Sequence, residues 1–239
     1  MSESILYICA HPDDCELMFG GMIHSFVKKG MDVSVIVVAD GSKWIKDETL
    51  LGEDIRKIRK NEALTALRML GVKDIKFLEY SDGVVDGKKL RDPLLDIIRE
   101  INPNIIFTHS EEEKHPDHIE VSRCVKRVCN RLSEPAPIIN PFWKSNFCPV
   151  SDFQQLYTYA ALSEVNEESV CFIPLEEEDI EKKICAVLCH KSQFMTEDKE
   201  RVYDRIMTEA KFFGNLCGRG YAEICASVRS QYYKVLSIV

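Results

Sequence analysis

Short apolar runs alternate with longer amphipathic stretches over the first 132 residues of the chain. The apolar runs have the length and β-branched content of strands buried on both faces, and they occupy residues 5–10, 32–39, 75–78 and 104–108. The stretches that follow them repeat apolar side chains at helical spacing and predict helices over residues 17–29, 53–70, 93–101 and 118–132. This alternation predicts an α/β protein with a Rossmann-like, mostly parallel, doubly wound sheet and flanking helices.

The remainder of the chain is less regular. Its apolar runs predict strands over residues 156–161, 170–173 and 232–239, and its amphipathic stretches predict helices over 175–190 and 197–216. Residues 133–150 contain four prolines and three large aromatic side chains, which indicates an ordered loop that borders a pocket. No change in composition marks a boundary, so we expect one domain over residues 1–239. Residues 1–132 would be its core, and residues 133–239 an extension that completes it.

The composition is that of an ordinary soluble globular protein, with 45% hydrophobic and 29% charged residues. The formal net charge is −8 and no block of Lys and Arg is present, so nothing favours a nucleic acid or an anionic membrane as partner. The apolar runs are far shorter than the roughly 20 residues that a membrane-spanning helix needs. The first of them has the length of a strand and leads into acidic residues, so we do not expect it to be a leader.

Ten cysteines are scattered along the chain without a CxxC pair, which argues against a zinc ribbon or a thioredoxin-like site. Several of them, such as Cys9 and Cys124, lie in apolar segments. We therefore expect buried free thiols in a reducing compartment, and we expect the protein to be cytoplasmic.

Two clusters of titratable side chains follow the first and the fourth predicted strand. The first cluster is His11-Pro-Asp-Asp-Cys-Glu16, and the second ends in His115-Pro-Asp-His118. With the usual strand order 3-2-1-4, these two strands are neighbours, and the winding reverses between them to open a crevice at their carboxyl ends. His115 and His118 are three residues apart at the start of a predicted helix and share one face of it. We therefore expect the two clusters to face each other across one crevice.

This set of residue types suits a metal-dependent hydrolase. Two imidazoles and one carboxylate that converge on a point are typical ligands of zinc, although iron and cobalt also use such a set. Three protein ligands leave a coordination position for water, as a catalytic zinc requires. A further acid beside the site can take the proton from that water.

The same residues carry a resemblance to a known family. His11-Pro-Asp-Asp-Cys-Glu16 with Gly20-Gly21, followed by His115-Pro-Asp-His118, resembles the PIG-L/LmbE family of zinc-dependent de-N-acetylases. Four weaker matches support it, at residues 59–62, 81–83, 188–193 and 221–223. The resemblance implies a zinc-dependent N-deacetylase that removes the acetyl group from an N-acetylglucosamine-type sugar or glycoconjugate.

The resemblance also implies roles for individual residues. His11, Asp14 and His118 would bind Zn²⁺, and Asp13 would be the general base for the metal-bound water. His115 would be a protonated imidazole that stabilises the oxyanion and helps the amine to leave. Asp117 would act behind these groups by orienting a histidine. Apart from the resemblance, we expect Glu16 to cap the following helix or to contact a metal ligand, in preference to binding the metal itself.

Three further residues are candidates for contact with the substrate. Arg59 would hold a sugar hydroxyl or an anionic substituent, or else be an exposed helix arginine. Asp82 follows a strand and should lie on the active-site edge of the sheet. His190 would line the site or a dimer contact, or else be a core histidine with its hydrogen bonds satisfied. His109 is expected near the pocket and His24 is expected to be structural.

Other functions stay open at this point. One alternative is an amidase with the same chemistry on another N-acyl amine, and one from a different class is a Rossmann-like nucleotide or sugar-nucleotide binding protein. The absence of G-x-G-x-x-G after the first strand argues against nucleotide binding, as does an acidic turn that would repel phosphate. The expected partner is a small N-acetylated sugar or glycoconjugate, and the family includes several homo-oligomeric assemblies.

Overall fold

The computed structural model describes residues 3–50, 53–132, 150, 153, 155–159 and 170–228. One seven-stranded sheet runs through it in the order β3-β2-β1-β4-β5-β7-β6. Its strands are β1 (Ser4–Cys9), β2 (Asp32–Ala39), β3 (Asp74–Tyr80), β4 (Ile105–Thr108), β5 (Gln155–Tyr159), β6 (Val170–Leu175) and β7 (Tyr221–Ser227). The first five strands in this order are parallel, and β7 is antiparallel to both β5 and β6. The mostly parallel sheet and the expected order 3-2-1-4 are confirmed.

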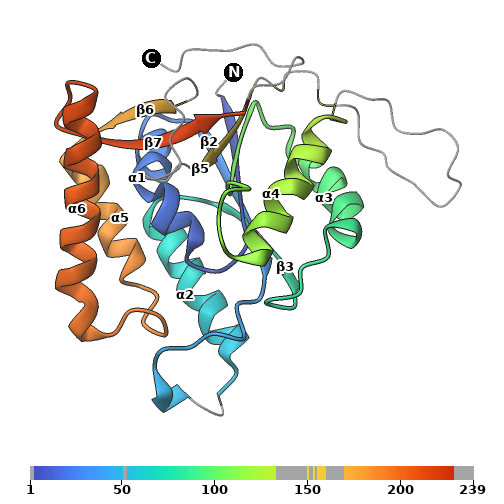
Figure 1. Ribbon diagram of the computed structural model, residues 1–239, viewed down its shortest axis with the longest axis horizontal. Coiled ribbons are helices and arrows are strands. Elements are labelled where there is room, and N and C mark those ends of the chain that lie inside the picture. The colour runs from blue at the N-terminus through green and yellow to red at the C-terminus, as the bar shows by residue number, and fades with distance from the viewer. Residues whose placement is uncertain are drawn as a thin grey trace, which may run out of the picture.

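Helices cover both faces of the sheet, as a doubly wound fold requires (Figure 1). They are α1 (Asp14–Lys28), α2 (Ile55–Met69), α3 (Gly87–Ile101), α4 (Pro116–Cys129), α5 (Glu177–Val187) and α6 (Lys199–Leu216), with short 3₁₀ turns at Glu48–Leu50 and Thr196–Asp198. Alternate side chains of β1 enter two separate apolar cores. Ile5 and Tyr7 pack with α1, α2, α5 and α6, whereas Leu6 and Ile8 pack with α3 and α4.

Aromatic side chains stack across neighbouring strands at the centre of the sheet. The ring of Phe107 on β4 lies 4.8 Å from that of Tyr7 on β1 and 5.1 Å from that of Tyr157 on β5. A slip of one residue in any of these strands would move its ring to the other face. The stack therefore helps to set the register of the strands whose carboxyl ends carry the polar clusters.

Helix α3 begins at Gly87, earlier than the predicted start at Pro93. Asp86 caps the helix by accepting a hydrogen bond from the backbone N–H of Lys88. Pro93 lies inside the helix and cannot donate to the carbonyl of Lys89, and the hydroxyl of Tyr80 donates to that carbonyl instead, at 3.3 Å. A proline that is typical of a first turn is thus accommodated in a helix interior.

Other sequence-based predictions differ from the structure or lie outside the described residues. Strand β7 was not predicted. The predicted loop over residues 133–150, apart from Val150, and the predicted strand over 232–239 are outside the described part of the chain. The structure also joins Cys9 and Cys15 in a disulfide with their Cα atoms 5.9 Å apart, so the expectation of free thiols is wrong for this pair. The reason is local, because the chain turns from β1 directly into α1 and brings the two side chains together.

Helix α6 packs against the start of β7 at Gly214. A Cβ atom added there would lie 2.6 Å from backbone atoms of Gly220 and Tyr221. We expect Gly214→Ala to lower the free energy of unfolding by about 1–3 kcal/mol, because overpacking against backbone outweighs the better helix propensity of alanine. Gly220→Ala is the control, since its Cβ would meet nothing within 4 Å. Urea denaturation followed by circular dichroism compares the two, and equal stability would contradict the packing described.

Candidate active site

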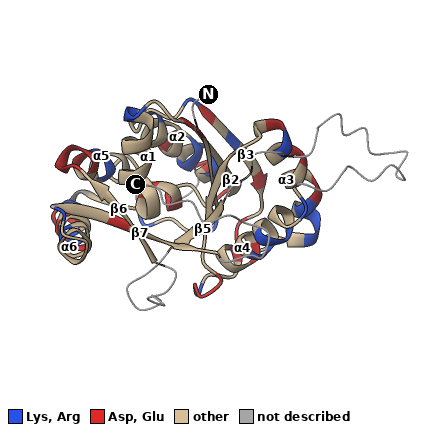
Figure 2. Ribbon diagram, turned by 90° about the horizontal axis from the view of Figure 1, so that it is seen from above, with Lys and Arg blue, Asp and Glu red and all other residues tan. Residues whose placement is uncertain are grey.

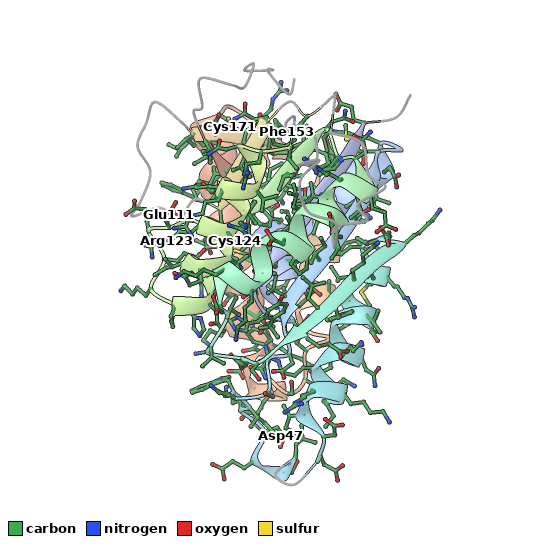
Figure 3. The ribbon with its side chains drawn as sticks, turned by 90° about the vertical axis from the view of Figure 1, so that its right-hand side faces the viewer. Asp47, Glu111, Arg123, Cys124, Phe153 and Cys171 are labelled. Carbon is green, nitrogen blue, oxygen red and sulfur yellow. A yellow bond between two sulfur atoms is a disulfide. The ribbon has the colours of Figure 1, made fainter. Side chains whose placement is uncertain are left out.

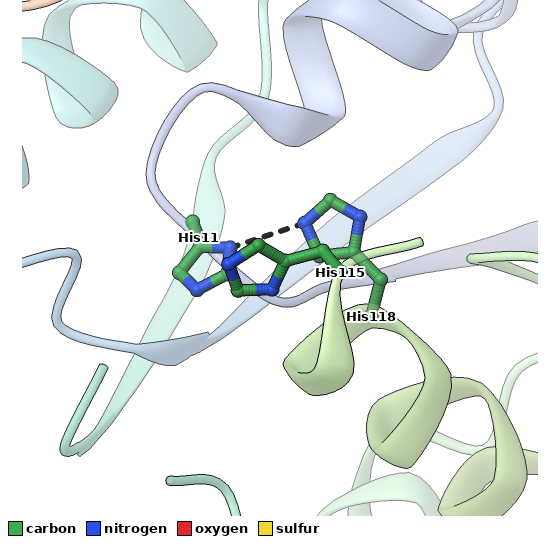
Figure 4. A group of neighbouring side chains, drawn as sticks. All are labelled: His11, His115 and His118. Atoms are coloured by element: carbon green, nitrogen blue, oxygen red, sulfur yellow. Dashed lines mark hydrogen bonds between the residues drawn. The ribbon is translucent and has the colours of Figure 1, made fainter. Parts of the chain in front are cut away.

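The two polar clusters meet at the carboxyl ends of β1 and β4, as the sequence predicted. Ile8 pairs with Thr108 where the two parallel strands end, so the loops that follow leave the sheet side by side. The ring of His11 lies 4.7 Å from that of His115 and 5.2 Å from that of His118, measured between centroids (Figure 4). His115 caps α4, and Pro116 occupies its first turn. The start of the helix is thereby fixed, and with it the positions of His115 and His118.

Three ligand atoms form a nearly equilateral triangle. His11 Nδ1 lies 3.2 Å from His118 Nε2, and Asp14 Oδ2 lies 3.4 Å from each of these nitrogens. Ligands about 2.0–2.1 Å from a tetrahedral zinc ion would be separated from one another by about 3.3–3.4 Å. The triangle therefore has the size of three corners of a zinc tetrahedron.

Carboxylates behind the histidines set the positions of the ring protons. Glu113 Oε2 lies 2.6 Å from His118 Nδ1, so that nitrogen carries the proton and Nε2 keeps its lone pair. Asp82 Oδ1 and Asp117 Oδ2 lie 3.1 and 3.2 Å from His11 Nε2, which leaves Nδ1 of that ring as the acceptor. When both rings are neutral, as metal ligation requires, both lone pairs point into the triangle.

Other groupings of these side chains fit an ion less well. His109 Nε2 lies 3.4 Å from Asp14 Oδ2, but it already accepts the backbone N–H of Ala10 at 2.8 Å. Asp117 Oδ2 accepts the backbone N–H of Gly83 and also contacts His11 Nε2, which uses both of its lone pairs. Asp14 Oδ2 accepts one backbone N–H, that of His11 at 2.7 Å, and keeps a lone pair for an ion. The residues that fit the ion best are therefore His11, Asp14 and His118, the set that the resemblance implied.

The charge of the cluster calls for a cation. Burial alone would lower the pKa of His11, but its contacts with Asp117, Asp14 and Asp82 raise that pKa to about 12. Burial alone would raise the pKa of Asp14, but His118, His109 and His11 hold it well below its usual range. The proton on His11 thus supplies positive charge among several ionised acids. A divalent ion bound to the triangle would supply that charge in its place.

Asp13 lies at the first turn of α1 in a rare backbone conformation, with φ 121° and ψ −25°. Non-glycine residues seldom have a positive φ, and such strain is concentrated at functional sites. Burial raises the pKa of Asp13 to about 6, although Arg59 acts against the increase. Asp13 is thus mostly ionised at neutral pH and has a pKa suited to taking up a proton.

Arg59 holds the loop that carries Asp13. Its side chain is 3% exposed, and its terminal nitrogens donate to the carbonyls of Pro12 at 2.7 Å and Gly41 at 2.8 Å. Nη2 also lies 3.1 Å from Asp13 Oδ1. Arg59 is therefore not the exposed helix arginine that was considered, and its sugar contact stays a prediction.

His115 lies at the rim of the site with Nδ1 accepting the backbone N–H of Asp117 at 3.3 Å. In a neutral ring the proton is then on Nε2, which remains a donor. Partial burial and the neighbouring His11 and His118 lower the pKa of His115. This direction opposes the protonated imidazole expected from the resemblance, and the Nε2–H tautomer supplies a donor without the charge.

Two predicted residues lie beneath the site. His190 is fully buried, and its Nε2 lies 3.1 Å from Glu16 Oε1. His190 thus lies in the core, the alternative that was considered for it, and its contact with substrate stays a prediction. Within the described residues Glu16 contacts this histidine, and neither His11 nor His118 is its partner. His24 is also paired, with its Nδ1 2.7 Å from Asp179.

A cavity of about 310 Å³ opens beside the triangle. It is lined by His11, Asp13, Trp44, Arg59, Asp82, His115, Gln193 and Phe194. Asp82, a predicted substrate contact, is among them. Gln193, in the segment that resembles the family, was considered together with His190 as a residue that lines the site, and it is also among them. Trp44 and Phe194 were not predicted from the sequence.

The loop after β4 is also held in place. Glu111 lies 3.2 Å from Arg123 Nε and 2.8 Å from Lys126 Nζ, which ties the loop to α4 (Figure 3). Glu113, two residues further on, contacts both His109 and His118. Its role was not predicted, because it is one of three consecutive glutamates and only the folded loop distinguishes it from its neighbours.

Comparison with known proteins assigns the family. The PIG-L family model, described as GlcNAc-PI de-N-acetylase, matches residues 6–129, more than half of the chain. The chain belongs to the PIG-L family. The resemblance noted from the sequence is thus confirmed, and the matched segment contains both clusters of the candidate site.

Three similar proteins are deacetylases. Diacetylchitobiose deacetylase of Thermococcus kodakarensis is 27% identical over 233 residues, covering 92% of this chain and 81% of the relative. The probable N-acetyl-alpha-D-glucosaminyl L-malate deacetylase 2 of Bacillus cereus is 30% identical over 148 residues, covering 59% and 67%. N,N'-diacetylchitobiose deacetylase from Pyrococcus horikoshii, solved with an inhibitor, superimposes with a TM-score of 0.84 at 25% identity and covers 99% of this chain and 88% of that chain. These PIG-L relatives are hydrolases that act on amide bonds.

Glu113→Gln tests the support behind the two histidines. We expect the dissociation constant of the metal to rise by about 10- to 100-fold, because an amide cannot accept from both imidazoles as the carboxylate does. Competition with a chromogenic chelator measures this constant. Glu112→Gln is the control, because its side chain is exposed. Equal affinity in both variants would show that Glu113 does not support the site.

Proposed function

We propose that this PIG-L protein is a zinc-dependent N-deacetylase that removes the acetyl group from an N-acetylglucosamine-type sugar or glycoconjugate. The observation that carries the proposal is the triangle of His11 Nδ1, Asp14 Oδ2 and His118 Nε2, with sides of 3.2–3.4 Å. The family and the printed activities of the relatives supply the class of substrate. Zinc is the finer part of the proposal and rests on the tetrahedral size of the triangle and its N₂O donor set.

The residues around the triangle divide the chemistry of amide hydrolysis. A divalent ion bound there would act as a Lewis acid and would lower the pKa of water toward about 7. Asp13 takes the proton from the attacking water, and Arg59 keeps its carboxylate in position. His115 presents Nε2–H to the carbonyl oxygen as negative charge develops there, and it faces the departing nitrogen. The proton that Asp13 takes up balances the one that the amine gains.

The histidine-bound carboxylates keep these groups in place through the reaction. Asp117 accepts two backbone N–H groups and contacts His11 Nε2, so the ring cannot turn without breaking that arrangement. Glu113 does the same for His118. Preorganisation of this kind removes the cost of ordering the ligands during turnover.

The alternatives are less well supported. An amidase for another acyl amine would use the same residues, but the matched relatives are deacetylases of N-acetylglucosamine conjugates. A nucleotide-binding protein would need donors for phosphate at the start of α1, where Asp13 and Asp14 lie instead. In the view of Figure 2, acidic and basic residues are interspersed over the described chain, which gives no support to a polyanionic partner.

Further parts of the proposal concern organisation and location. Residues 1–239 would act as one domain, because β5, β7 and β6 extend the sheet that the first four strands begin. Cys9 and Cys15 form a disulfide, whereas Cys124 and Cys129 are thiols buried in the core, which suits the cytoplasm as the place of the reaction. No helix within the described residues is long and apolar enough to cross a bilayer.

Metal analysis combined with release of free amine tests the function. Purified protein is analysed for bound metal and then assayed on N-acetylglucosamine, diacetylchitobiose, malate- and inositol-linked N-acetylglucosaminides and a sugar nucleotide. Near-stoichiometric zinc with amine release from one of these compounds is the expected result. Metal without turnover on any of them would favour another acyl amine. Failure to bind metal after reconstitution would overturn the hydrolase.

A further inference from the structure

Trp44 stands at the rim of the active-site cavity with its side chain exposed. At 68% exposure it is the most exposed large hydrophobic residue in the described part of the chain. It nevertheless lines the same cavity as Asp13 and His115. An indole that is open to solvent next to reacting groups offers a flat apolar face to whatever extends out of the cavity.

The loop that carries Trp44 is fixed on both sides. The backbone N–H of Lys43 donates to Asp82 at 3.0 Å, and that of Lys46 donates to the carbonyl of Ser192 at 3.0 Å. Gln193 Nε2 donates to the carbonyl of Trp44 itself, at 3.2 Å. Lys46 also forms an ion pair with Asp198. The indole is therefore presented by a backbone that the fold already orders, so a ligand that contacts it bears little of that ordering cost.

The tip of the loop is ordered separately. Asp47 lies at this tip (Figure 3) and accepts hydrogen bonds from the backbone N–H and the hydroxyl of Thr49, at 3.0 and 2.6 Å. The short 3₁₀ turn at Glu48–Leu50 follows. Because these contacts order the tip of the loop, its conformation does not depend on the packing of the Trp44 side chain.

The size of the cavity places the indole beyond the reacting sugar. A volume of about 310 Å³ is at the lower end of the range for small-molecule sites. The amine must lie near His115 and the water near Asp13, so the sugar that bears the acetamido group occupies the cavity itself. A substituent on that sugar then leaves through the rim, where Trp44 is.

The charges of the cavity decide which substituent fits. Of the described residues that line it, Arg59 is the one Lys or Arg, and its terminal nitrogens are engaged by Pro12, Gly41 and Asp13. Asp13 and Asp82 contribute negative charge. Among the described residues that line the cavity, an anionic group such as malate would find no free cation, and the exposed Lys43 lies outside that lining with its Nζ beside Gly83. A neutral ring with a C–H face can stack on indole without being desolvated as a charge.

We propose that Trp44 is a specificity-determining residue that stacks on a neutral ring, a second sugar or a cyclitol, linked to the reacting N-acetylglucosamine. This inference rests on the proposed function and narrows its substrate class. It favours diacetylchitobiose or an inositol-linked conjugate over a malate-linked one. The stacking acts on binding, so its loss should appear chiefly in KM and not in kcat.

Kinetics of Trp44 variants test the proposal. For Trp44→Ala we expect the ratio of kcat/KM for diacetylchitobiose to kcat/KM for N-acetylglucosamine to fall by about 3- to 10-fold, mostly through KM. Trp44→Phe should restore most of this ratio, because phenylalanine keeps an aromatic face. Leu216→Ala is a matched control on α6, since Leu216 is 61% exposed and lies outside the cavity. An inositol-linked substrate distinguishes a cyclitol from a second sugar.

Fluorescence separates this proposal from the proposed function. The chain has two tryptophans, so Trp143→Phe leaves Trp44 as the sole indole. In an Asp13→Asn background, diacetylchitobiose should change the emission more than N-acetylglucosamine or the malate-linked compound. That result without turnover in the parent enzyme would support the stacking and overturn the deacetylase. Turnover with an unchanged substrate ratio in Trp44→Ala and no selective emission change would overturn the stacking and leave the deacetylase standing.

Discussion

Asparagine in place of Asp13 is expected to lower kcat by about 10²- to 10⁴-fold while bound metal stays near stoichiometric. Asparagine has the shape of aspartate and, like aspartate, is among the non-glycine residues that most often adopt a positive φ, which is 121° at this position. It also retains an oxygen that accepts from Arg59, which lies 3.1 Å from Asp13 Oδ1. What it lacks is the ability to take a proton, so the variant isolates the general base from the structure of the loop.

Two measurements on the same preparation check this result. Metal per chain is determined by atomic emission, and kcat by release of free amine from the best substrate. Asp32→Asn is the matched control, because Asp32 is exposed at the opposite end of β2 and should leave both values near those of the parent. Loss of metal in Asp13→Asn equal to that in a ligand variant would transfer the ligand role to Asp13. A kcat within tenfold of the parent would remove Asp13 as the base.

Much of the fold was predictable because its central strands are encoded locally. The apolar runs of β1, β2 and β4 are buried on both faces, so they read as continuous hydrophobic segments without knowledge of the partner strands. The run of β3, at the edge of the sheet, is half-buried but still apolar enough to be recognised. Alternation with helices then left few topologies, and the order 3-2-1-4 brought His11 and His118 together across a separation of 107 residues. The triangle of His11, Asp14 and His118 atoms follows from this topology.

Strand β7 was not predictable by the same means. Its sequence, Tyr-Ala-Glu-Ile-Cys-Ala-Ser, is poor in β-branched residues and includes a buried glutamate. Glu223 is tolerated there because Lys183 Nζ lies 2.6 Å away and the backbone N–H groups of Gly21 and Met22 donate to its carboxylate. The strand is thus specified by long-range pairing with β5 and β6 and by this buried ion pair.

The parts of the site that escaped prediction share a physical cause. The role of Glu113 depends on how the loop after β4 turns, and that of His190 depends on Glu16, which is 174 residues away. Trp44 lies in a polar loop whose position is set by contacts with Ser192 and Gln193. Motif spacing identifies residues that act through one secondary-structure element. It does not identify residues that are positioned by distant segments.

Removal of a metal ligand should have the other large effect, and His118→Ala is the most direct test. With one corner of the triangle gone, His11 and Asp14 remain, and we expect bound metal to fall far below one ion per chain. Turnover should fall by at least about 10³-fold, because the pKa of water then returns from about 7 toward its bulk value of about 15.7.

Zinc should raise the melting temperature of the metal-free parent protein and leave that of His118→Ala unchanged, since only a bound ligand stabilises the native state. His24→Ala is the matched control, because His24 pairs with Asp179 on α5. This variant should bind as much metal as the parent protein. Reconstitution of the parent with Zn²⁺, Fe²⁺ or Co²⁺ then compares the ions, with zinc expected to suit the tetrahedral triangle best. Full metal binding in His118→Ala, combined with its loss in His109→Ala, would move the ligand set to the other side of Asp14, because His109 Nε2 lies 3.4 Å from the same carboxylate oxygen.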